Sequence, residues 1–272
     1  LFIVPLQAFV QQKSPRDRLG EILACSNFLN FLGVALAAVI FLWLTKGLGM
    51  TAQGCFIVNG LMTAVLATAA FMVLPDFIVR FMNLILTRII YRLRTVGLEN
   101  IPVTGPALLV SNHVTWSDAL IISATQQRRI RFIMERSIYR NRWLNPLFRL
   151  MRVIPISAND SPHQLEAALQ TAKHALDDGA LVCVFPEQRL TRNGNLLRFK
   201  SGIEHILKGT NHPLIPVYIG GGWGSVLSHY HGRLMTRMPT RRVHITVVIG
   251  APLPADTTSY AARLAVSELA QD

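Results

Sequence analysis

The chain has 272 residues, 51% of them hydrophobic, and a mean hydropathy of +0.35, which is too apolar for an ordinary soluble domain. Its net charge is +12, and eight of those charges come from eleven arginines set against three acidic residues between positions 81 and 152. Such a basic stretch suits an anionic membrane surface, phosphate head groups or nucleic acid, with a merely solvated face as the alternative.

Two apolar segments occupy most of the first eighty residues. Residues 22–44 and 54–74 contain no charged side chain. Each segment has about twenty residues, enough to cross a hydrocarbon core of roughly 30 Å as a helix. Buried helices of a soluble domain are the alternative, and two spans argue against a cleaved signal peptide. We therefore expect a transmembrane helical hairpin within residues 1–76.

Basic residues around these segments predict their orientation. Lys13, Arg16 and Arg18 precede the first segment, several arginines follow the second, and the turn between them holds only Lys46. Positively charged flanks stay in the cytoplasm. Both outer ends of the hairpin, and the domain that follows it, are therefore expected on the cytoplasmic side.

The first part of the chain resembles a transporter. Residues 5–33, PLQAFVQQKSPRDRLGEILACSNFLNFLG, resemble the stretch that joins the last helices of a major-facilitator transporter, and residues 1–10 resemble the end of an earlier span. The resemblance implies a fragment that holds the last two helices, and a piece of a third, of a larger transporter. Two helices cannot form an alternating-access machine, so transport by this piece is not expected.

Residues 77–96 are apolar, with Arg80, Arg88 and Arg92 recurring near helical spacing. This pattern predicts an amphipathic helix lying at the membrane interface, with its arginines reaching lipid phosphates. Few aromatic residues accompany the basic stretch, so membrane lipids are favoured over nucleic acid, which would need bases to stack.

From residue 97 to 272 the hydrophobic pattern alternates between strand and helix periods. The expected strands are residues 107–111, 131–135, 152–156, 181–185, 214–219 and 243–249. The expected helices are residues 117–124, 137–150, 161–178, 201–208 and 258–270. Strands that alternate with helices predict one α/β domain with a mostly parallel sheet and flanking helices.

Chemistry-bearing residues follow two of the expected strands. The segment NHVTWSD places His113 in a loop and Asp118 on the first turn of the next helix, where the side chains can meet. A capping aspartate beside a polar loop histidine is the alternative. The expected strand at residues 181–185 runs into the sequence FPEQR, which puts Glu187 and Arg189 at its carboxyl end, where open α/β sheets bind ligands.

These two motifs, together with the later HPLIPV at residues 212–217, resemble the glycerolipid acyltransferases, the PlsC-like enzymes, over about residues 77–254. The resemblance implies that His113 removes the proton from an acceptor hydroxyl as it attacks an acyl thioester, and that Asp118 orients His113. A covalent acyl-serine intermediate through Ser111 or Ser117 is the disfavoured alternative.

The same resemblance implies residues that contact the substrate. Glu187 and Arg189 match the motif that binds the phosphate-bearing head group of the acceptor, and Lys200 and Gly202 match a weaker element after it. For Arg189 a surface salt bridge is the alternative. Asn112 is expected at the site too, as a loop brace or a turn residue. The chain departs from the family at position 188, where glycine is usual; glutamine stands here and lacks the freedom of glycine to adopt positive φ.

Residues 223–225, 232–233, 239–242 and 243–254 narrow the resemblance to acyltransferase domains fused behind a transporter, of the 2-acylglycerophosphoethanolamine acyltransferase type. This implies a bacterial-type inner-membrane enzyme that acylates lysophosphatidylethanolamine or lysophosphatidate from acyl carrier protein or CoA thioester, with no cofactor. An inactive domain that only binds lipid is the rival. The histidines and cysteines show no metal-ligand spacing, so no metal is expected.

Overall fold

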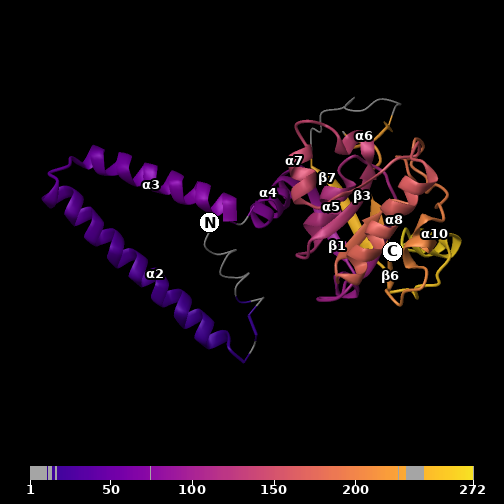
Figure 1. The fold of residues 1–272 in the computed structure, drawn as a ribbon, viewed down its shortest axis with the longest axis horizontal. Coiled ribbons are helices and arrows are strands. Elements are labelled where there is room, and N and C mark those ends of the chain that lie inside the picture. Colours follow the sequence, from indigo (N-terminus) through magenta and orange to yellow (C-terminus); the bar gives the residue numbers. More distant parts are fainter. Residues whose placement is uncertain are drawn as a thin grey trace. The chain divides into compact units, whose positions relative to one another are not determined.

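The computed structural model describes residues 11, 14–15, 17–73, 75–225, 227–230 and 242–271. Two compact units divide the chain, Leu1–Val73 and Leu74–Asp272 (Figure 1). The expectations for residues 1–10, 13, 16, 232–233 and 239–241 lie outside the described residues.

The first unit is a pair of long apolar helices. Helix α2, Leu19–Leu42, continues into a π-helical turn, Trp43–Gly47, and helix α3 spans Ala52–Val73. By length and composition, Leu19–Gly47 and Ala52–Ala69 can each cross a membrane. Phe31 on α2 and Phe56 on α3 are each 77% exposed. These helices thus display to their surroundings the apolar surface that a membrane or further helices would cover.

The second unit is built on a seven-stranded sheet in the order β1-β7-β6-β2-β5-β3-β4. The strands are β1 Tyr91–Val96, β2 Ala107–Ser111, β3 Ile130–Glu135, β4 Ile154–Ile156, β5 Leu181–Val184, β6 Leu214–Gly220 and β7 Val243–Ile249. Every neighbouring pair is parallel except β6 and β7. The predicted α/β class with a mostly parallel sheet is confirmed.

Helices cover both faces of this sheet. They are α4 Pro75–Ile90, α5 Asp118–Thr125, α6 Arg136–Tyr139, α7 Asn145–Leu150, α8 Pro162–Asp177, α9 Gly202–Leu207 and α10 Ser259–Glu268. Successive side chains of β2 point to opposite faces. Leu108 and Val110 join a core with α8, α9 and α10, whereas Leu109 joins a core with α5. The central strand is therefore buried on both faces, which explains its unbroken apolar run.

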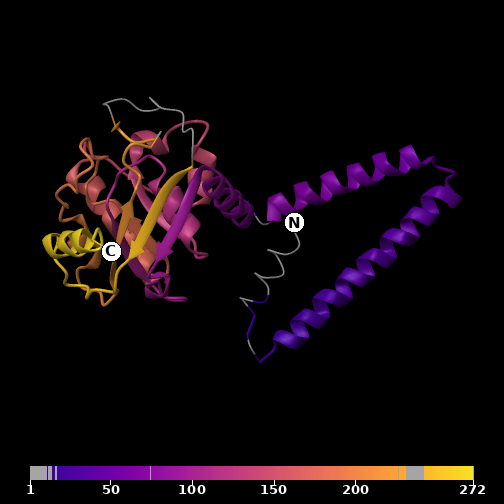
Figure 2. The same ribbon diagram turned by 180° about the vertical axis from the view of Figure 1, so that it is seen from behind.

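The helix predicted over residues 77–96 is wrong in its last part. Helix α4 ends at Ile90, and Tyr91–Val96 is the edge strand β1, which lies beside β7 (Figure 2). Its sequence YRLRTV alternates between buried or half-buried and exposed side chains. That period of two indicates a half-buried strand, and the recurring arginines obscured it.

Arg80 also differs from its predicted role at the lipid surface. Its guanidinium forms an ion pair with Asp76 at 3.2 Å and donates to the carbonyl oxygen of Gln127. Arg80 thus ties α4 to the domain.

The single helix predicted over residues 137–150 is two short helices, α6 and α7. Pro146 lies in the first turn of α7. Proline has no backbone N–H and clashes with the preceding turn inside a helix, but it fits a helix start. A continuous helix therefore cannot run through Pro146, and the proline in the sequence indicates that a new helix begins next to it.

Candidate active site

His113 and Asp118 meet at the carboxyl end of β2. Nδ1 of His113 lies 2.9 Å from Oδ2 of Asp118, and the Asp118 side chain is completely buried while that of His113 is 24% exposed. A neutral imidazole whose Nδ1–H donates to a carboxylate keeps its Nε2 lone pair free to accept a proton. The pair therefore has the arrangement of a general base with its orienting carboxylate.

The loop ahead of α5 holds the Asp118 carboxylate in place. Oδ2 also accepts the backbone N–H groups of Val114 at 2.6 Å and Thr115 at 2.9 Å, and Oδ1 accepts the Thr115 hydroxyl at 2.6 Å. These donors precede the helix, so Asp118 does not act as the helix cap of the alternative interpretation. By accepting these hydrogen bonds, the Asp118 carboxylate fixes the loop that carries His113.

A chain of hydroxyl groups extends from Asp118 to Tyr91 on β1. Thr115 gives its one proton to Asp118, so Ser117 must be the donor in the 2.9 Å contact between Ser117 and Thr115. Tyr91 must then donate to Ser117, also at 2.9 Å. Burial raises the pKa of Tyr91 above its ordinary value, which keeps the phenol protonated. The hydroxyl protons of Tyr91, Ser117 and Thr115 thus all point toward the Asp118 carboxylate. This arrangement was not predicted from the sequence.

The loop after β5 holds His113 from the other side. The Phe185 ring stacks on the imidazole, with centroids 4.2 Å apart. The Glu187 carboxylate accepts the backbone N–H groups of His113 at 3.1 Å and of Leu197 at 3.2 Å. The carbonyl oxygen of His113 accepts the N–H of Thr191 at 3.0 Å. The imidazole is therefore fixed by its backbone, by its ring face and by its Nδ1 atom.

Glu187 and Asn112 are buried, and their side chains bind backbone groups; for Glu187 this differs from the expected contact with the acceptor, whereas for Asn112 it agrees with a brace. Burial raises the pKa of Glu187 to about 7, against the opposing effect of its two N–H donors. The Asn112 side chain donates to the carbonyl oxygen of Ile219 at 3.0 Å and accepts the Ile219 N–H at 2.8 Å. Both residues brace the site: Glu187 joins the two loops, and Asn112 joins β2 to β6.

Arg189 and Lys200 lie on the loop after β5, and Gly202 is the first residue of α9. The Arg189 side chain is exposed and makes no hydrogen bond or ion pair with any residue that the structure describes, unlike the salt bridge of the alternative interpretation. The Lys200 side chain is exposed too, while its N–H donates to the Pro186 carbonyl at 3.0 Å. Gly202 opens α9, and a Cβ there would meet only Leu169 at 3.8 Å. Arg189 and Lys200 are therefore open to a ligand.

Gln188 sits between Glu187 and Arg189 with φ of 59°. This left-handed conformation is the one that glycine adopts without strain. The loop therefore keeps a backbone shape that suits glycine, although glutamine occupies the position.

The serines beside the motif do not form a triad with His113. The Ser111 hydroxyl donates to the backbone oxygen of Asn112 at 3.1 Å, and Ser117 lies in the hydroxyl chain behind Asp118. Among the described residues there is also no cluster of three or more His, Cys, Asp or Glu side chains that could hold a metal ion.

Part of the chain is similar to known proteins. Residues 92–220 match the family model described as Acyltransferase. The chain is 27% identical over 157 residues to the chloroplastic 1-acyl-sn-glycerol-3-phosphate acyltransferase LPAT1 of Arabidopsis thaliana, covering 55% of this chain and 44% of that protein. It is 25% identical over 162 residues to a probable 1-acyl-sn-glycerol-3-phosphate acyltransferase of Mycoplasma pneumoniae, covering 57% and 59%.

A solved structure shares the fold. The crystal structure of the 1-acyl-sn-glycerophosphate acyltransferase PlsC from Thermotoga maritima aligns with a TM-score of 0.52 and 22% identity, covering 66% of this chain and 72% of that one. The chain spans about half the length of the curated relatives it matches.

Proposed function

We propose that residues 92–220, which match the Acyltransferase family model, form a PlsC-like domain that transfers a fatty acyl group from a thioester to the free hydroxyl of a lysophospholipid. The observation that carries the proposal is the 2.9 Å contact between His113 Nδ1 and Asp118 Oδ2, which leaves Nε2 as the base.

In the proposed reaction, Nε2 of His113 takes the proton of the acceptor hydroxyl as that oxygen attacks the thioester carbonyl carbon. Asp118 stabilises the imidazolium that forms. Collapse of the tetrahedral intermediate breaks the carbon–sulfur bond, and the imidazolium returns its proton to the leaving thiolate. One ester forms, one thiol leaves, and His113 is neutral again without a covalent enzyme intermediate.

We propose lysophosphatidate or lysophosphatidylethanolamine as the acceptor and acyl carrier protein or CoA thioester as the donor, with no cofactor. The similar proteins from Arabidopsis thaliana and Mycoplasma pneumoniae are named as 1-acyl-sn-glycerol-3-phosphate acyltransferases, the second as a probable one, which supports a phosphate-bearing acceptor. The exposed guanidinium of Arg189 supports the same class, because its planar fork can donate two hydrogen bonds to one phosphate.

The experiment that tests the proposal supplies the purified chain with a labelled acyl thioester and each lysophospholipid in turn. Acylated product that depends on both substrates is expected. Absence of product with every acceptor, together with lipid binding by the folded chain, would instead support the rival function of an inactive lipid-binding domain.

Arg189→Ala is expected to raise the KM for the lysophospholipid far more than the KM for the thioester. The loss of one charge-assisted contact costs about 1.5–3 kcal/mol, or roughly 10- to 150-fold. Steady-state kinetics with each substrate varied separately measure the two constants. Arg192→Ala, also exposed on this loop, is the matched control. An equal rise in both constants would mean that Arg189 does not recognise the acceptor.

Gln188→Gly is expected to keep or increase acyl transfer. A non-glycine residue at positive φ is strained by roughly 1–2 kcal/mol, and glycine removes that strain at a cost of about 1 kcal/mol in unfolded-state entropy. The free energy of unfolding should therefore stay level or rise by up to about 1 kcal/mol, as measured by denaturant unfolding. A glycine variant slower on every acceptor would show that the Gln188 side chain itself contributes to the pocket.

We also propose that the protein lies in a bacterial-type inner membrane with the acyltransferase domain facing the cytoplasm. Four apolar side chains of α4, Met82, Ile85, Leu86 and Ile89, are 38–58% exposed. Their i, i+3, i+4, i+7 spacing gives α4 an apolar stripe suited to the membrane interface.

The helix pair α2 and α3 is proposed to be the end of a major-facilitator module fused to the domain. Its exposed apolar surface and its sequence resemblance support the proposal. Sequencing the complete open reading frame tests it, and an upstream region without further apolar spans would refute the fusion.

A further inference from the structure

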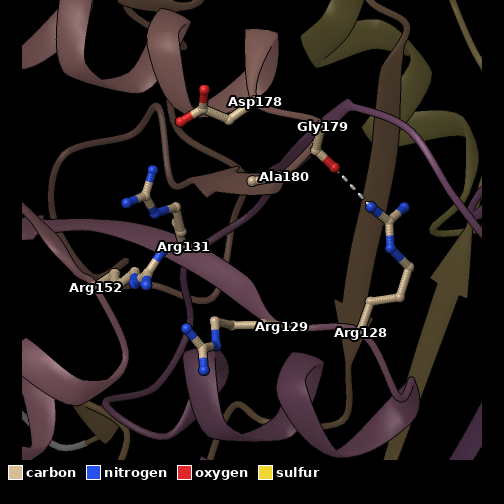
Figure 3. A pocket seen from close by; sticks show the side chains of 7 residues that line it. All are labelled: Arg128, Arg129, Arg131, Arg152, Asp178, Gly179 and Ala180. Atoms are coloured by element: carbon tan, nitrogen blue, oxygen red, sulfur yellow. Dashed lines mark hydrogen bonds between the residues drawn. The ribbon is translucent and has the colours of Figure 1, made fainter.

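Four arginines gather around a cavity of about 320 Å³ in the acyltransferase domain (Figure 3). They are Arg128, Arg129, Arg131 and Arg152, and the acidic residue in the lining is Asp178. The arginines come from the segments that lead into β3 and β4 and from the start of β3, and Asp178 precedes β5. The cavity is thus at the amino ends of three parallel strands.

This cavity is separate from the site around His113. Glu187 and Phe185 follow the carboxyl end of β5, whereas Gly179 and Ala180 in the cavity wall precede its amino end. The strand between them, Leu181–Val184, spans roughly 13 Å at 3.3 Å per residue. The basic cavity and the catalytic histidine therefore lie at opposite edges of the sheet.

Two of the four arginines have structural partners. The Arg128 guanidinium donates to the carbonyl oxygens of Pro102 and Gly105, each at 2.7 Å, and of Gly179 at 2.9 Å. Arg129 forms an ion pair with Asp76 at 2.9 Å. Backbone carbonyl groups carry no net charge and do not neutralise the Arg128 guanidinium. The side of the cavity that Arg128 lines is therefore positively charged.

Arg131 and Arg152 have no such partner. Among the described residues neither guanidinium makes a hydrogen bond or an ion pair, and Asp178 is not within ion-pair distance of either. The pKa of Arg131 is lowered, first by burial and then by the charge of Arg152, while the charge of Asp178 acts in the opposite direction. Arg131 is half-buried and Arg152 is exposed, so two like charges without an ion-pair partner face each other at the mouth of the cavity.

The backbone of Arg152 adds a second observation. Its φ is 53°, an unfavourable conformation for a non-glycine residue. The hydrogen bonds from Arg152 N to Arg149 O and from Val153 N to Phe148 O, each 3.0 Å, hold this turn at the end of α7. Strain that the surrounding structure maintains is typical of ligand sites. Here the strained residue lines the cavity together with Arg131 (Figure 3).

We propose that this cavity binds a phosphate group, with Arg131 and Arg152 as its two ligating side chains. Each planar guanidinium can donate a pair of hydrogen bonds to phosphate oxygens, and a dianion removes the repulsion between the two cations. The phosphate is either that of a phospholipid head group or free phosphate in solution. The site would make the stability of the domain depend on the anion.

The test uses the full chain in micelles of a neutral detergent and follows its unfolding temperature. Inorganic phosphate is titrated at constant ionic strength held with chloride. A saturable rise is expected for the parent, because a ligand bound only to the folded state stabilises it. For Arg131→Gln and Arg152→Gln the half-saturating phosphate concentration should increase at least about tenfold. Without phosphate each variant should unfold at the parent temperature or above it.

Arg92→Gln is the matched control, because Arg92 is an exposed arginine on β1, the opposite edge strand of the sheet. It should keep the parent phosphate dependence. Mixed micelles with phosphatidate or with phosphatidylcholine form the second arm. A shift with phosphatidate but not with inorganic phosphate identifies a lipid head group, and the reverse identifies free phosphate. The proposal is overturned if neither anion shifts the parent, or if the Arg131 and Arg152 variants respond as the parent does.

Discussion

Replacing His113 by alanine is expected to lower acyl transfer by at least about 10²–10⁴-fold, the contribution of a positioned general base. The imidazole is the group whose Nε2 remains free while Nδ1 is held by Asp118 at 2.9 Å. The backbone contacts of His113 with Glu187 and Thr191 do not involve the side chain and should survive the change. Formation of labelled phospholipid from the acyl thioester measures the loss.

His212→Ala is the matched control for this prediction. His212 also pairs with an aspartate, Asp177, at 2.8 Å, but the pair is remote from the carboxyl edge of the sheet. Its removal should leave turnover close to that of the parent. The two variants should also keep the parent's secondary structure in circular dichroism. If the His113→Ala protein turned over as fast as the parent, His113 would not be the base and the proposed mechanism would be lost.

Asp118→Asn is expected to keep the fold and to lower kcat by about 10²–10⁴-fold. An amide oxygen at the position of Oδ2 can accept the same three N–H groups, from His113, Val114 and Thr115. The negative charge that stabilises the imidazolium is lost. Kinetics at saturating acceptor measure kcat, and a variant with the parent kcat would show that the charge of Asp118 is not needed.

The hydroxyl chain gives the same substitution a second, independent signature. The new amide NH₂ must donate to Thr115, so the protons of Thr115, Ser117 and Tyr91 have to reverse, and the Tyr91 proton loses its acceptor. A buried unsatisfied donor costs about 1–3 kcal/mol. Tyr91→Phe should destabilise the parent and should not restore stability in the Asp118→Asn background, because the reversed Ser117 hydroxyl then loses the Tyr91 oxygen as its acceptor. Denaturant unfolding of the four proteins measures this double-mutant cycle.

Local patterns were sufficient for much of the fold and for the centre of the site. The apolar run of β2 and the alternation of strand and helix periods predicted a mostly parallel sheet, which the structure confirms. The spacing of His113 and Asp118 predicted that their side chains meet, because five residues that cross from a strand into a helix leave little freedom in the loop. Where the pattern was short or mixed, as in β1 and at Pro146, the prediction was wrong.

By itself, then, the sequence determined the class of the domain, the helix pair and the contact between His113 and Asp118, since each depends on residues close together along the chain. Only the tertiary structure decided which residues hold His113 and the neighbouring strands in place. Glu187 braces His113 across 74 positions and Asn112 braces Ile219 across 107. The arginine cavity likewise joins segments leading into β3, β4 and β5. These contacts follow from which strands lie side by side, and strand order is set by packing of the whole sheet rather than by any local pattern.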